Sequence, residues 1–92
     1  MAQVVVTLKI MPESPETDLG KIEAQIKSKI ISFYNSKDIR ASQEPIAFGL
    51  KALKLIFVID ESNGSTDALE DQIKIISGVN SVEAVDVRRA IG

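Results

Sequence analysis

The chain has 92 residues, a formal net charge of −2, and a composition that is 45% hydrophobic and 26% charged. It contains neither cysteine nor histidine, which excludes disulfides, Cys/His zinc sites, thiolate catalysis and histidine general-base catalysis. The acidic balance argues against a general nucleic-acid binder, and no apolar run approaches the roughly 18 residues that suggest a membrane span. Because the amino terminus also lacks a secretory-signal pattern, we expect one cytoplasmic domain over residues 1–92.

The first predicted element is a strand over residues 4–10, where apolar side chains alternate with polar or smaller ones. The next segment, Met11–Glu16, contains two prolines and is expected to end that strand. The side chains predicted to face the core are Val4, Val6, Leu8 and Ile10.

A helix is predicted to begin at Thr17-Asp18, because Thr17 can cap its free amide groups and Asp18 suits the positive end of its dipole. Apolar residues then recur at spacings of three and four, which gives one buried stripe. The predicted stripe consists of Leu19, Ile22, Ile26, Ile30 and Phe33. The polar segment Asn35–Asp38 is expected to end this helix.

Two strands follow with an unusual loop between them. Ile39–Glu44 is polar, which is typical of an edge strand, whereas Lys51–Asp60 is fairly apolar on both faces and is placed centrally in the sheet. The loop Pro45–Leu50 is apolar, although loops are usually polar because their backbone is solvated. Its side chains could fold back onto the core, or they could anchor a partner with Lys51 and Lys54 beside them.

The last third begins with the turn-rich segment Glu61–Ser65, which includes the strong turn pair Asn63-Gly64. A second helix is predicted to start at Thr66-Asp67 and to close at Ser77-Gly78, and Val79–Ala90 holds the final strand. The predicted inward residues are Leu69, Ile73 and Ile76 in the helix and Val82, Val85 and Val87 in the strand, with an irregularity near Ala84.

The order strand, helix, strand, strand, helix, strand indicates an α+β fold. With right-handed crossovers it predicts a ferredoxin-like βαββαβ sandwich, in which a four-stranded antiparallel sheet carries two helices on one face. The other face has no helix to cover it, which makes it both a routine feature of the fold and a natural partner site. Its predicted residues include Val5, Thr7, Lys54, Ile56 and Val58.

No catalytic constellation is visible in the sequence. The adjacent carboxylates Asp60-Glu61 and Glu70-Asp71 should point apart, since strand neighbours face opposite sides and helix neighbours diverge by about 100°. There is no glycine-rich phosphate loop, so the chain shows no nucleotide site, and no cofactor or metal is expected. By elimination, we expect a binding or regulatory module rather than an enzyme with covalent chemistry of its own.

Four segments carry a family resemblance, of which Val82–Val87 is similar to the family's closing strand. Pro45-Ile46-Ala47-Phe48-Gly49-Leu50-Lys51-Ala52-Leu53 resembles the Pro-x-Gly-aromatic-Gly-apolar-Lys-x-Leu signature of the elongation factor 1-beta exchange domain, with Ala47 in place of the usual glycine. Glu16–Leu19 and Gly64–Ile73 are similar to the starts of that family's two helices. The similarity runs in order through nearly the whole chain, and its length looks like that of the archaeal form.

The resemblance implies a guanine nucleotide exchange factor for elongation factor 1-alpha, the GTPase that delivers aminoacyl-tRNA during protein synthesis. Such a factor promotes exchange of GDP for GTP by weakening the hold of the GTPase on GDP and magnesium. It implies no direct nucleic-acid or membrane partner, and we expect a monomer when the protein is free.

Transfer of site residues from the family is partial. Phe48 matches the family's loop aromatic and is the expected interface anchor, with Lys51 as a nearby polar contact and Ile46 and Lys54 beside it. Eukaryotic members end with a functional lysine thought to intrude near the magnesium site of the GTPase, whereas this chain has no lysine there. Arg88 or Arg89 could take that role, or both could be solvated terminal charges.

Two other classes of function remain open at this point. An RNA-binding ferredoxin-like module is disfavoured by the acidic charge and by the lack of stacking aromatics on the central strands. The other class is a regulatory domain that binds a small metabolite and associates through its sheet. A nucleotide-sensitive complex with the GTPase would exclude that as the main role.

Overall fold

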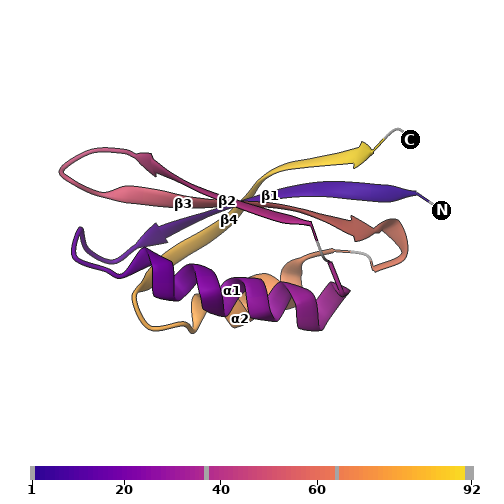
Figure 1. Cartoon of the computed structure of the whole chain (residues 1–92), viewed down its shortest axis with the longest axis horizontal. Helices are drawn as coiled ribbons and strands as arrows, with labels where there is room; N and C mark the ends of the chain where they lie inside the picture. Colours follow the sequence, from indigo (N-terminus) through magenta and orange to yellow (C-terminus); the bar gives the residue numbers. More distant parts are fainter. Residues whose placement is uncertain (1, 37, 64, 91–92) are drawn as a thin grey trace.

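The computed structural model describes residues 2–36, 38–63 and 65–90. The described strands form one four-stranded antiparallel sheet in the order β2-β3-β1-β4, and both helices cover the same face of it (Figure 1). The elements are β1 Gln3–Pro12, α1 Leu19–Tyr34, β2 Ile39–Pro45, β3 Lys51–Asp60, the 3-10 helix η1 Glu61–Asn63, α2 Asp67–Lys74 and β4 Val79–Ala90. This arrangement confirms the predicted ferredoxin-like α+β fold.

The core lies between the sheet and the two helices, and the central strands β1 and β3 supply most of its sheet side. Alternate residues of these strands point toward the helices, as the sequence pattern predicted. The fully or nearly fully buried apolar side chains include Val6, Leu8, Ile10, Ile22, Ile26, Ile30, Leu53, Leu55, Phe57, Leu69 and Ile73. None of the described helices is long and apolar enough to cross a membrane.

The end of α1 corrects the predicted stripe. Phe33 is 41% exposed, although its spacing placed it with the buried residues. Tyr34, one position further on, packs against the core instead and stacks on Phe57, with ring centroids 6.2 Å apart. Phe33 lies tilted against Tyr34 at a centroid distance of 5.9 Å. The helix then ends at Asn35, whose left-handed φ of 54° and N–H bond to the Ile31 carbonyl confirm the predicted stop.

Both helix starts differ in detail from the prediction. Asp18, rather than Thr17, caps α1, and its Oδ1 accepts a hydrogen bond from the Lys21 N–H at 3.1 Å. Thr66 precedes α2 but makes no capping bond, because its hydroxyl donates to Glu70 Oε2 at 2.8 Å. The predicted Asn63-Gly64 turn falls partly outside the described residues, since Gly64 is not among them.

Strand β1 runs two residues beyond its predicted end and includes Pro12. Proline is tolerated there because the ladder between β1 and β3 stops at Ile10–Leu53, so Pro12 pairs only with Val79 of β4. The predicted break by the first proline was therefore wrong.

Strand β4 contains the predicted irregularity, which also overturns part of the predicted inward set. Thr7 pairs with Asp86 while Leu8 pairs with Ala84, so the register skips Val85. Ala84 consequently packs against the core, and Val85 is 42% exposed. Val87 is opposite Val6 but is 59% exposed, because it lies on the edge strand and is not covered there. Of the three predicted valines, only Val82 is buried.

Candidate functional site

The hairpin between β2 and β3 ends in a tight turn over Ala47–Leu50. The Leu50 N–H donates to the Ala47 carbonyl at 2.9 Å, and the Ile46 N–H donates to the Leu50 carbonyl at 2.8 Å. The two central residues, Phe48 and Gly49, have φ angles of 54° and 78°. Two positive φ angles in succession are what a type I′ turn requires, and that turn matches the twist of the strands that it joins.

Phe48 lies at the tip of the turn, where its aromatic side chain adds nothing to the stability of the fold. Its side chain is 95% exposed, and its left-handed backbone costs an aromatic residue about 1 kcal/mol. Asparagine, aspartate or glycine would suit this turn position better. An aromatic residue that is both strained and uncovered therefore indicates a role outside the folded chain.

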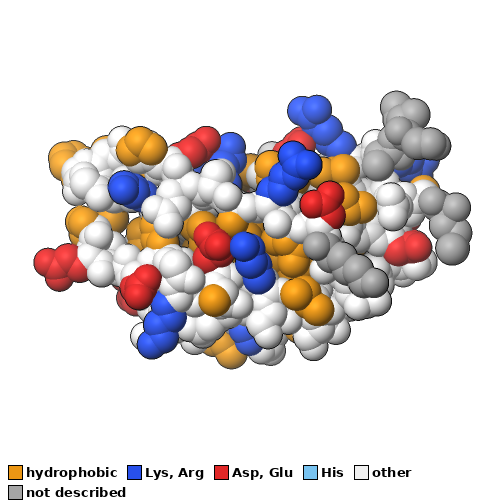
Figure 2. All heavy atoms as spheres, in the orientation of Figure 1, with side chains coloured by type: hydrophobic (Ala, Val, Ile, Leu, Met, Phe, Trp, Pro, Cys, Tyr) orange, Lys and Arg blue, Asp and Glu red, His pale blue; other side chains and the backbone are white. Residues whose placement is uncertain are grey.

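Other apolar groups surround this tip. Ile46 is 45% exposed, and Leu50 is half-buried but does not pack against the core. Of the two interpretations of this loop, the one in which its side chains fold back onto the core is therefore wrong. Figure 2 shows hydrophobic side chains gathered at this end of the molecule, with charged side chains close by. Exposed apolar groups inside a charged rim are typical of a protein–protein contact.

The tip rests on the loop that joins β1 to α1. The position of a Cβ on Gly49 would lie 3.8 Å from Pro15 Cβ, which is ordinary van der Waals contact. That loop is itself held by Glu13, whose N–H donates to the Gly78 carbonyl at 2.9 Å and whose Oε1 accepts from the Gly78 N–H at 3.1 Å. A shallow hollow between tip and loop is lined by residues that include Pro15, Thr17, Asp18, Gly49 and Lys51.

The two predicted lysines differ in their surroundings. Lys54 Nζ lies 3.2 Å from Glu44 Oε1 on the neighbouring strand, so its charge is already paired within the hairpin. Exposed pairs of this kind contribute only about 0–1 kcal/mol, so a partner could displace one at little cost. Lys51 is exposed at the base of the turn and forms no ion pair with the described part of the chain.

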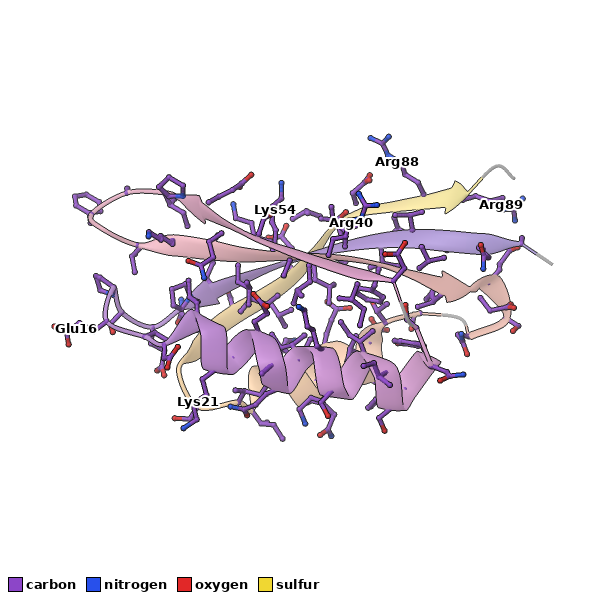
Figure 3. The ribbon with its side chains drawn as sticks, in the orientation of Figure 1. Glu16, Lys21, Arg40, Lys54, Arg88 and Arg89 are labelled. Carbon is purple, nitrogen blue, oxygen red and sulfur yellow. The ribbon has the colours of Figure 1, made fainter. Side chains whose placement is uncertain are left out.

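The predicted arginines lie at the other end of the molecule (Figure 3). Arg88 pairs with Val5 and Arg89 with Val4 in the ladder between β4 and β1, so their side chains leave opposite faces of the sheet. Arg88 Nε lies 2.9 Å from Asp86 Oδ2, and Arg89 forms an ion pair with Glu61 of η1.

The six predicted site residues therefore do not form one site. The molecule measures 42 Å along its longest axis, and the hairpin and the arginines lie toward opposite ends of that axis (Figures 1 and 3). Sequence reasoning missed the acidic partner of each arginine. For Asp86 and Arg88 a signal existed, because residues two apart in a strand share a face.

Shifted pKa values occur away from the hairpin tip. The Ser62 N–H donates to Asp60 Oδ1 at 2.9 Å and lowers the pKa of that carboxyl group. Burial raises the pKa of the Tyr34 hydroxyl, and the nearby carboxylates Glu70 and Asp67 raise it further. Within the described residues, no three carboxylates come together in a way that could hold a metal ion.

Comparison with known proteins finds relatives over nearly the whole chain. A family model described as the EF-1 guanine nucleotide exchange domain matches residues 5–90. The chain is 44% identical to elongation factor 1-beta of Methanobrevibacter smithii and 42% identical to that of Methanoregula boonei. These matches cover 97% and 95% of this chain and 98% and 96% of those proteins.

A solved structure shares the fold alone. It is LarC2, the C-terminal domain of a cyclometallase involved in the synthesis of the NPN cofactor of lactate racemase, in its apo form. The match has a TM-score of 0.65 at 12% identity and covers 99% of this chain and 58% of that chain.

Proposed function

The chain belongs to the EF-1 guanine nucleotide exchange domain family, and from this premise we propose how its surface engages elongation factor 1-alpha. It is a guanine nucleotide exchange factor of translation elongation that promotes replacement of GDP by GTP on that GTPase. Linkage makes the action reciprocal: if the factor weakens GDP binding, GDP weakens binding of the factor by the same amount. The factor therefore speeds exchange without changing which nucleotide is favoured at equilibrium.

The proposed anchor is Phe48, which would enter an apolar pocket of the GTPase. The observation that carries this proposal is the combination of 95% exposure with a left-handed backbone, because folding gains nothing from an aromatic residue there. Truncation of a buried aromatic hot-spot residue to alanine costs an interface about 2 kcal/mol or more. Ile46 would add apolar contact beside it, and Lys51 and Lys54 would supply polar contacts at the rim.

At the opposite end, Arg88 is the better candidate for the role of the missing terminal lysine. Its ion pair joins two residues of the same strand, so releasing it disturbs nothing else. The pair between Arg89 and Glu61 instead ties β4 to η1. We infer that the GTPase is contacted at both ends of the long axis. The protein would act in the cytoplasm as a single copy, without chemistry of its own and without direct contact to nucleic acid or membrane.

The test is release of a fluorescent GDP analogue from the cognate elongation factor 1-alpha. The wild-type chain should accelerate release, Phe48→Ala should abolish most of that effect, and Arg88→Ala should reduce it more than Arg89→Ala. Gln25→Ala, on an exposed position of α1, is the matched control and should leave the acceleration intact. If the wild-type chain gave no acceleration at saturation, the proposed activity would be wrong, and the RNA-binding and metabolite-binding alternatives would return.

A further inference from the structure

The outer edge of β2 has a free backbone. This strand pairs with β3 over its whole length and has no described strand on its other side. Pro45 is opposite Lys51 and has no N–H, so this pair cannot be a hydrogen-bonded one, and the adjacent Ile46 N–H bonds to Leu50 instead. Hydrogen-bonded and non-hydrogen-bonded pairs alternate along an antiparallel ladder. Ile39, Ala41 and Gln43 are therefore also in non-hydrogen-bonded pairs with β3, and their N–H and carbonyl groups point away from β3, toward the free edge.

The side chains along this edge form a self-complementary pattern. Arg40, Ser42 and Glu44 are exposed and share the face of the sheet away from the helices, the side on which Figure 3 places Arg40 and Lys54. If a second copy is laid antiparallel about a twofold axis at Ser42, each Arg40 is opposite a Glu44 of the other copy. In the same register Ala41 is opposite Gln43, so the outward backbone groups of both copies meet.

Neighbouring registers lack this match. Centring the axis on Arg40 or on Glu44 would place like charges directly opposite each other, which is destabilising in a sheet. Centring it on Ala41 would place Glu44 opposite the acidic Asp38. Opposite charges and matching backbone groups coincide only when the axis lies at Ser42.

We propose that β2 is a self-association edge, through which two copies pair antiparallel about Ser42 and join their sheets into one. Such a contact is isologous, since each copy contributes the same strand. A seven-residue strand offers less area than a standard interface, so the dimer forms weakly and with increasing protein concentration. The monomer expected from the sequence is then the dilute form. The inference rests on the geometry of β2 and does not depend on the proposed exchange function.

A cysteine introduced at the axis reports the register directly, because the chain has no cysteine of its own. In the proposed dimer, Ser42 lies opposite Ser42 of the second copy in a non-hydrogen-bonded pair, in which the two Cα atoms are about 4.5 Å apart. A disulfide can span that distance. Under mild oxidation Ser42→Cys should form a covalent dimer at least tenfold faster than Ser81→Cys, an exposed control on the opposite edge strand. Equal rates would overturn the proposal.

Charge reversal tests the pairing without a crosslink. Arg40→Glu and Glu44→Arg alone each create like-charge pairs across the axis and should weaken the dimer at least tenfold by sedimentation equilibrium. The double variant should restore wild-type association, and a mixture of the two single variants should form heterodimers. Lys54→Ala removes only the partner of Glu44 within the chain and should leave the dimer intact. Failure of the double variant to recover, or a wild-type chain that stays monomeric at millimolar concentration, would refute the proposal.

Discussion

The tip of the β2–β3 hairpin and the middle of β3 each carry a phenylalanine, and the fold uses the two in opposite ways. Phe57 is fully buried and stacks on Tyr34, whereas Phe48 is 95% exposed on a left-handed backbone. Folding depends on the first residue and is opposed slightly by the second. A side chain that does nothing for the stability of its own chain, or acts against it, is therefore a better candidate for contact with a partner than one that the core requires.

The largest effect on stability is expected in the middle of β3. Phe57→Ala should lower the free energy of unfolding by about 3–5 kcal/mol, because it removes a large buried ring and leaves a cavity. Urea denaturation followed by circular dichroism measures this loss. Phe57→Leu keeps most of the volume and should cost about 1.5 kcal/mol or less. A small loss for the alanine variant would contradict the role given to this residue in the core.

The largest effect on activity is expected at the tip. Phe48→Ala should reduce the acceleration of GDP release roughly thirtyfold, which corresponds to about 2 kcal/mol for a buried anchor. Its free energy of unfolding should stay within about 0.5 kcal/mol of wild type, since the ring has almost no intrachain contact to lose. Loss of activity together with a comparable loss of stability would mean that Phe48 is a structural residue.

A third variant sharpens the contrast by separating folding from binding. Phe48→Asn places an Asn-Gly pair in a turn with two positive φ angles, which is the preferred sequence for a type I′ hairpin. It should therefore stabilise the fold by about 0.5–1 kcal/mol while reducing exchange as much as alanine does. Thermal unfolding checks the predicted gain in stability, and GDP release, measured on the same preparation, checks the predicted loss of exchange. An active and stabilised variant would show that the ring is not the anchor.

The sequence predicted the elements well because its periodicities report burial, and burial decides the layers of this fold. It also singled out Phe48, because an apolar loop residue is unusual and because the surrounding motif resembles a known family. Two features could be read only in part from one sequence. An irregularity near Ala84 was predicted, but which residue it skips depends on pairing with β1, and the tolerance of Pro12 depends on where the ladder between β1 and β3 stops. Both are decided by neighbouring strands rather than by the residues themselves.

The candidate site shows a similar limit. The motif identified the hairpin, and the end of the chain suggested the two arginines, but no local pattern gives the distance between them. Their placement toward opposite ends of a 42 Å molecule follows only from the path of the strands. A sequence can thus supply the candidate residues of an interface without showing that they fall into two groups.

A smaller effect is expected from the glycine beside Phe48. Gly49 has a φ of 78°, where a side chain is strained even though its nearest neighbour, Pro15, leaves room. Gly49→Ala should therefore cost about 1 kcal/mol of stability. Gly20→Ala, in helical backbone at the start of α1, should instead stabilise the protein by up to about 1 kcal/mol. Equal effects of the two substitutions would contradict the strained geometry of the tip.

The smallest effect is expected at Asp60, at the opposite end of β3 from the hairpin. The Ser62 N–H lowers the pKa of its carboxyl group, so the ionised form is favoured in the folded chain. Stability from this bond is present above the unfolded pKa of about 4 and is lost as the pH falls through the lower folded pKa. Asp60→Asn should therefore lower the melting temperature slightly at pH 7 and progressively less as the solution is acidified below about pH 4. GDP release at pH 7 should be unchanged, because Asp60 is not among the residues proposed to contact the GTPase, although it lies at the same end of the sheet as Arg89. A variant that kept its stability but lost exchange would instead add Asp60 to the proposed contact surface at that end.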